Sequence, residues 1–173
     1  IGDRNWTDES RELFIRLLAS GPALLNVWED IDFIDVPGKL IPEWLGVRNR
    51  PSASAAHRYT IDRHMVEVVT RLGRETPSGG RYDDRHYEAL LLAGILHDIG
   101  KRPGVANHAA EGARHATVVV ERMGFDRDIV RWVTLLVREH LTLSEFATGR
   151  NPNDPNVGDD LAGRLDHNPV LLD

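Results

Sequence analysis

The stretch Leu90-Leu91-Leu92-Ala93-Gly94-Ile95-Leu96-His97-Asp98-Ile99-Gly100-Lys101 decides how the rest of the chain is interpreted. A run of apolar residues interrupted only by small ones is typical of a fully buried helix. An imidazole and a carboxylate follow it side by side, and burying both is costly unless each has a partner. A metal ion would partner both; in the alternative interpretation, Asp98 is solvated and His97 bonds to a carbonyl group.

The composition of the 173-residue chain is that of one domain, or of one domain with an appendage. Without cysteine, disulfides and thiolate sites are excluded, so any metal must be held by histidine and carboxylate groups. The net charge of −6 argues against nucleic-acid binding. No apolar run is long enough to span a membrane, and no signal-peptide pattern is present. We therefore expect a cytoplasmic protein with neither a nucleic-acid nor a membrane partner.

Before the central stretch, the sequence predicts two short helices and a connector. Thr7 is expected to cap the first helix, with Leu13, Leu17 and Leu18 as its buried face. A second helix is expected from Ala23 to Ile31. Residues 35–54 are rich in proline and glycine, and they predict an ordered connector anchored by three apolar side chains, Ile41, Trp44 and Leu45.

The rest of the chain also has helical periodicity and no strand pattern, so we expect an all-α domain. One helix is predicted from Tyr59, and the central helix from about Arg85 to Ile99. Asn107 and Asp126 are expected to cap the two helices that follow. After a polar loop at residues 149–155, Asp159 onward predicts one or two short helices.

Three further histidines fall on the inward faces of the helices expected to pack around the central one: His64, His108 and His140. A single inward histidine is most often a satisfied core residue. Several of them, each near a helix end, favour a shared metal centre with His97 and Asp98. His57 and Arg58 precede His64 closely, and we expect them to line the substrate entrance.

His64 followed by His97-Asp98-Ile99-Gly100-Lys101 resembles the HD superfamily of metal-dependent phosphohydrolases. The motifs at residues 41–44, 47–51, 57–64 and 137–141 more closely resemble the HD domain of enzymes that uridylylate and deuridylylate the PII nitrogen-signalling protein. The resemblance implies an HD-domain helical bundle at residues 56–173, preceded by an N-terminal helical extension and connector at 1–55. It also implies that this is a single module excised from a longer enzyme.

The resemblance further implies roles for individual residues. His64, His97 and Asp98 match the core metal ligands, and His108 and His140 match the histidines that hold a second ion. Lys101 matches a lysine that contacts a phosphate oxygen. The implied cofactor is a divalent metal, Mn or Mg first, with Fe, Co and Zn as alternatives. The implied reaction is removal of UMP, or of AMP in some relatives, from a tyrosine of PII.

The chemistry fits these residues independently of the resemblance. A divalent ion activates water near neutral pH. Asp98 can orient that water or accept its proton, and Lys101 can offset charge on the phosphoryl oxygens, so both are expected to be catalytic. A tyrosinate leaving group, with a pKa near ~10, needs little acid assistance.

Two departures from the family pattern leave alternatives open. HD domains close the site with a late aspartate, but Asp154, Asp159, Asp160, Asp166 and Asp173 lack the usual context, so we expect the closing aspartate beyond residue 173. The turn before His108 reads Val105-Ala106-Asn107 in place of Gly-Gly-Asp, which leaves the orientation of His108 open. The alternative functions are an HD hydrolase of small nucleotides and a non-catalytic regulatory module that binds PII or glutamine. Oligomeric state is not predicted.

Overall fold

The structure is a computed structural model that describes residues 6–52, 58–73, 83–151, 154 and 156–168. Within these ranges it is built from helices and contains no β-strand. An isolated antiparallel bridge between Pro51 and Thr60 is the β-type pairing found there. The all-α prediction is therefore confirmed. No helix in the described ranges has both the length and the apolar character needed to cross a bilayer.

The helices follow one another with short connections. In chain order they are α1 (Asp8–Leu18), α2 (Ala23–Phe33), α3 (Val36–Leu40), the 3₁₀ helix η1 (Pro42–Gly46), α4 (Ile61–Leu72), α5 (Asp84–Leu96), α6 (His108–Arg122), α7 (Arg127–Glu139), α8 (Thr142–Gly149) and α9 (Asn156–Arg164).

Side-chain caps explain where several helices begin. Thr7, Asp83, Asn107 and Asp126 each accept a hydrogen bond from a backbone N–H in the first turn of the helix that follows. Such a cap satisfies one of the donors that a helix N-terminus leaves without a partner. The caps predicted at Thr7, Asn107 and Asp126 are confirmed.

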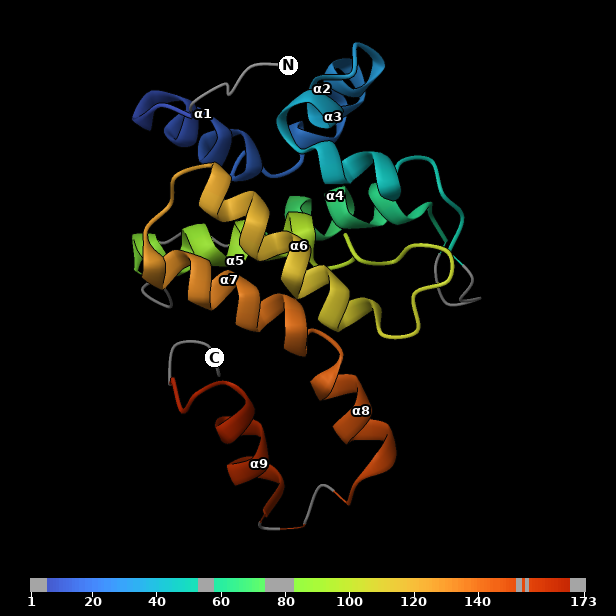
Figure 1. Ribbon diagram of the computed structural model, residues 1–173, viewed down its shortest axis with the longest axis vertical. Coiled ribbons are helices and arrows are strands. Elements are labelled where there is room, and N and C mark those ends of the chain that lie inside the picture. Colours follow the sequence, from blue (N-terminus) through green and yellow to red (C-terminus); the bar gives the residue numbers. More distant parts are fainter. Residues whose placement is uncertain (1–5, 53–57, 74–82, 152–153, 155, 169–173) are drawn as a thin grey trace.

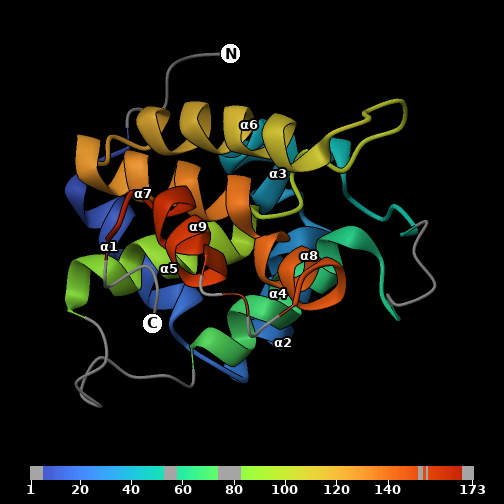
Figure 2. The same cartoon turned by 90° about the horizontal axis from the view of Figure 1, so that it is seen from below.

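Helix α5 lies at the centre of the bundle. It packs against α4 and α7, and α6 and α7 lie side by side across the front of the view in Figure 1. Its leucine and isoleucine side chains at 91, 92, 95 and 96 are fully buried, as the apolar run predicted. Helices α8 and α9 continue from the end of α7 and extend away from the bundle in Figure 1, and Figure 2 views the molecule from their side.

The N-terminal part differs from the prediction in detail. Leu13 is 53% exposed, whereas Phe14 is buried and takes its place in the core. Five of the six residues at positions 13–18 are apolar and allow more than one helical face, and the packing of α1 against α5 selects the face with Phe14 and Leu18. In the expected connector, Ile41 and Trp44 are buried anchors as predicted, but Leu45 is 54% exposed.

Two glycines permit the close helix packing that positions the site. A Cβ atom on Gly94 of α5 would lie 2.8 Å from Leu72 Cδ1 of α4. A Cβ atom on Gly100 would lie 2.7 Å from the Cα atom of Gly112 in α6. A larger residue at position 94 would require side chains of α4 to shift, whereas one at position 100 would require the backbone of α6 to move.

Candidate metal centre

The five residues predicted as metal ligands converge on one place in the bundle. His64 lies in the first turn of α4, and His97 and Asp98 directly follow α5. His108 is the first residue of α6, and His140 directly follows α7. Four helix ends therefore meet here, and each places an imidazole near the carboxylate of Asp98. Whether these residues bind a metal stays a prediction.

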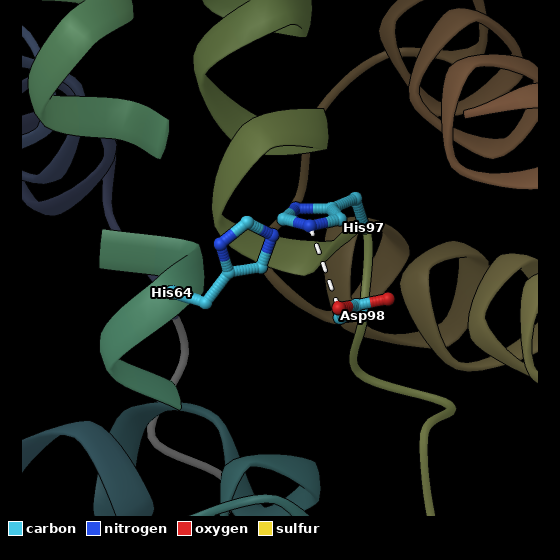
Figure 3. A group of neighbouring side chains, drawn as sticks. All are labelled: His64, His97 and Asp98. Carbon is cyan, nitrogen blue, oxygen red and sulfur yellow. Dashed lines mark ion pairs between the residues drawn. The ribbon is translucent and has the colours of Figure 1, made fainter. Parts of the chain in front are cut away.

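The first group of donor atoms comes from His64, His97 and Asp98, which are drawn in Figure 3. One donor atom from each residue lies within 4.8 Å of the others. The two imidazole rings meet nearly edge to face, with centroids 5.1 Å apart. His97 Nε2 lies 3.7 Å from Asp98 Oδ2. This separation is too long for a hydrogen bond but suits two side chains that share an ion.

The second group consists of Asp98, His108 and His140, again with donor atoms within 4.8 Å of one another. Asp98 Oδ1 lies 3.7 Å from His108 Nε2 and 3.5 Å from His140 Nε2. Asp98 therefore presents one carboxylate oxygen to each group, and it is itself buried, with a relative exposure of 2%. A carboxylate shared by two donor groups is compatible with a pair of ions bound side by side.

Backbone carbonyls orient two of the imidazoles. His97 Nδ1 lies 2.8 Å from the carbonyl oxygen of Gly94, and His140 Nδ1 lies 2.7 Å from that of Val137. Because a carbonyl oxygen only accepts, each Nδ1 carries the proton and each Nε2 keeps its lone pair. Histidine ligands in metal sites are commonly held this way. Nε2 of His140 is also buried without a good hydrogen bond, so the donor set fits a divalent ion.

The carboxylate of Asp98 is held in its ionised form. Burial alone would raise its pKa, but contact with His140 and electrostatic interaction with His97 and Lys101 outweigh burial, so the pKa lies well below its ordinary value. Lys101 Nζ lies 3.1 Å from Asp98 Oδ2. The two residues predicted to be catalytic are thus in direct contact.

His97 is held in its neutral form. Burial lowers the pKa of His97 to about 4, although the neighbouring Asp98 opposes that shift. Only a neutral imidazole can donate its Nε2 lone pair to a cation. At neutral pH the site therefore combines an ionised carboxylate with a neutral imidazole. A cation could bind without first displacing a proton from His97.

This pKa predicts that the metal-free protein loses stability on acidification. In the unfolded chain His97 titrates near ~6.5, whereas in the folded protein the value is about 4. The stability contributed at His97 is therefore complete above pH ~6.5 and is lost as the pH falls toward 4, by up to ~3 kcal/mol. Urea unfolding with EDTA at pH 7 and pH 4.5, for the wild type and His97→Gln, measures this. Equal pH dependence in the two proteins would contradict it.

The other predicted residues are placed differently. Arg58 lies on the surface, with its guanidinium 5.7 Å from the ring centroid of Tyr59. His57 lies outside the described residues. Of the late aspartates, Asp160 pairs with Arg150 and Asp166 with Arg131. Neither aspartate belongs to the two donor groups found in the described ranges.

The sequence did not indicate what fixes the distances in this site. The carbonyl groups that hold His97 and His140 belong to residues three positions earlier, and every helical residue has such a carbonyl. The contact of Gly100 with Gly112 was likewise missed. A glycine directly after His-Asp-Ile was the available signal, because a glycine near a helix end often marks close backbone approach.

Comparison with known proteins finds relatives that are similar over most of the chain. The chain is 40% identical over 151 residues to the bifunctional uridylyltransferase/uridylyl-removing enzyme of Streptomyces coelicolor, which covers 87% of the chain and 17% of that enzyme. The enzyme of the same name from Mycobacterium tuberculosis is 34% identical over 168 residues, covering 97% of the chain and 20% of the enzyme. That from Caulobacter vibrioides is 34% identical, covering 92% of the chain and 18% of the enzyme.

Two other comparisons gave no match: no protein-family model matches the chain, and no solved structure matches it. The chain spans about a fifth of the length of the curated relatives it matches. The similarity nevertheless extends over most of the chain in each case, and it includes the stretch from which the site is built. The chain is therefore a homologue of one segment of the bifunctional uridylyltransferase/uridylyl-removing enzymes.

Proposed function

We propose that this chain is a metal-dependent phosphodiesterase module that removes UMP, or AMP, from a modified tyrosine of the PII protein. The observation that carries the proposal is the buried Asp98 shared by two groups of histidines. The name of the relatives, which includes uridylyl removal, supports the reaction. The resemblance to HD phosphohydrolases supports the hydrolytic class and the PII substrate.

In this proposal His64, His97, Asp98, His108 and His140 hold one or two divalent ions, with Mn or Mg first and Fe, Co or Zn as alternatives. When bound, such an ion supplies positive charge that activates water and polarises a phosphoryl oxygen. The protein contributes the preset tautomers of His97 and His140 and the buried carboxylate of Asp98, which belongs to both donor groups. These features lower the reorganisation needed when an ion binds.

Asp98 and Lys101 have separate roles. The ionised carboxylate of Asp98 orients the attacking water by accepting a hydrogen bond from it. Lys101 Nζ, held 3.1 Å from Asp98, offsets the charge that develops on the phosphoryl oxygens. We further propose that His57 and Arg58 line the substrate entrance and that residues 56–173 form the catalytic domain of a cytoplasmic enzyme.

The proposed role of Lys101 predicts that its replacement lowers kcat much more than it lowers the Mn affinity. Lys101→Met keeps the alkyl chain but removes the charge, so we expect kcat to fall by about 100-fold while the Mn affinity changes only a few-fold. Isothermal titration with Mn and single-turnover hydrolysis measure the two effects on the same protein. An equal loss of affinity and turnover would assign Lys101 to the metal site instead.

The experiment that tests the proposed function combines metal analysis with substrates of different classes. Elemental analysis and a Mn titration come first, followed by uridylylated PII, adenylylated PII and free nucleotides as substrates. Faster release of UMP or AMP from PII than hydrolysis of free nucleotides supports the proposal. Preference for free nucleotides would favour a small-nucleotide hydrolase. Binding of PII without metal uptake or turnover would favour a regulatory module.

A further inference from the structure

The connection between Asp98 and His108, residues 99–107, carries Lys101 and leads into α6. Backbone hydrogen bonds fold its first part back on itself: the Lys101 N–H donates to the Asp98 carbonyl at 2.9 Å, and the Arg102 N–H donates to the Gly100 carbonyl at 2.8 Å. These local bonds shape the turn. They do not fix its position relative to the rest of the bundle, which requires a contact with another element.

Gly100 makes one such contact, with Gly112 of α6, and Arg102 makes another, with η1. Its Nη2 donates to the carbonyl oxygen of Glu43 at 2.8 Å. A Cβ atom on Gly46 would lie 2.6 Å from the guanidinium carbon of Arg102 and 2.8 Å from Nη2. The guanidinium therefore occupies the space that a side chain at position 46 would need, and only glycine leaves room for it.

The same part of η1 is bound to α6. The carboxylate of Glu43 accepts two hydrogen bonds from Arg122, at 2.9 and 2.7 Å. Burial would raise the pKa of Glu43, but its bonds to Arg122 outweigh burial and lower it, as expected for an ionised pair. Helix α6 follows the 99–107 connection and ends at Arg122. Element η1 therefore contacts the connection through Arg102 and the far end of the following helix through Arg122.

Stability alone is a poor explanation for Arg102. Its Nε is buried and donates to no acceptor in the described part of the chain. Leaving a buried donor without a partner is unfavourable, and an apolar side chain of similar length would avoid that cost. Local rules of this kind are most often broken near functional sites.

We propose that Arg102 is a positioning residue. It packs against Gly46 and donates a hydrogen bond to the Glu43 carbonyl, and it thereby holds the 99–107 connection in the position from which His108 and Lys101 reach Asp98. Arg102 does not touch the donor atoms itself. This inference rests on the proposed metal-dependent function, because it assigns Arg102 a role toward the second donor group.

Two single variants and their combination test the proposal. Arg102→Met removes the guanidinium, and Gly46→Ala displaces it without changing Arg102. Because both variants break one contact, the double variant should be no worse than the more damaging single variant. Arg114→Met is the matched control, since Arg114 is an exposed arginine of α6 that pairs with Glu111 in the same helix.

Hydrogen exchange of the metal-free protein is the first readout. We expect amides at residues 99–108 to exchange at least about 10-fold faster in both single variants, while those of α5 keep wild-type rates. A Mn titration is the second readout. Affinity for the ion that uses His108 should fall by about 10- to 100-fold, with the ion at His64, His97 and Asp98 bound as before. Arg114→Met should match the wild type in both.

The outcomes separate this inference from the proposed function. Unchanged exchange at residues 99–108 in both single variants would overturn the positioning role, whatever the metal result. Faster exchange with Mn affinity within twofold of wild type would also overturn it, because the connection would then not control His108. If the wild type binds no Mn, the proposed function fails, and the exchange data alone decide whether Arg102 holds the connection.

Discussion

Replacing Asp98 with asparagine is expected to abolish both Mn binding and hydrolysis. The substitution keeps the shape of the side chain and removes the one charged donor common to both groups of histidines. We expect Mn affinity to fall by more than about 100-fold and turnover by at least about 1,000-fold. Isothermal titration and release of UMP from uridylylated PII measure these effects.

The matched control is Asp166→Asn. Asp166 is a late aspartate, as the closing ligand of HD domains is, but it pairs with Arg131 at 2.9 Å. We expect this variant to bind Mn and turn over like the wild type. If Asp98→Asn kept wild-type Mn affinity, the metal centre would be elsewhere. If Asp166→Asn lost it, Asp166, in the turn after α9, would itself be a metal ligand.

Gly100→Ala is expected to have the largest effect on the fold. The added Cβ atom would lie 2.7 Å from the Cα atom of Gly112, and it would also meet the backbone at His108, so only movement of main chain could relieve the clash. Overpacking of a tightly packed interior costs about 1–3 kcal/mol, and here no flexible side chain can yield. We expect Tm to fall by roughly 10 °C.

The variant should also weaken Mn binding, because α6 begins with His108 and would be displaced from Asp98. Gly149→Ala is the control, since a Cβ atom there meets nothing within 4 Å. We expect its Tm and Mn affinity to stay close to those of the wild type. A Gly100→Ala protein with unchanged Tm and Mn affinity would show that the contact between Gly100 and Gly112 is not needed.

The repeating apolar patterns and the cap residues were readable from sequence. Asn107 and Asp126 precede their helices with the side chains that N-caps require, and the structure uses both in this way. The sequence also predicted that His64, His97, Asp98, His108 and His140 would lie together, because several amphipathic helices each carry an inward histidine near one end; their role as metal ligands stays a prediction. Local chemistry is sufficient for both, since a cap and a helical face depend on residues a few positions apart.

The face that a helix buries was harder to predict. In α1 the sequence favoured Leu13, but the structure buries Phe14 and exposes Leu13. Leu45 and Trp44 are adjacent apolar residues, and only Trp44 enters the core. Adjacent apolar residues are equivalent by composition. Which of them is buried depends on the neighbouring helix that packs against them, and the arrangement of helices is a property of the whole bundle.

The sequence by itself determined that this chain is helical, that its central helix is buried, and which five side chains are available to hold a metal. Only the tertiary structure decided how those side chains meet. His64, Asp98, His108 and His140 come from four separate elements, and their distances depend on close backbone contacts such as that of Gly100 with Gly112. The packing contact between Arg102 and Gly46 likewise joins positions far apart in the chain. Such contacts depend on packing between elements, so no local pattern in the sequence encodes them.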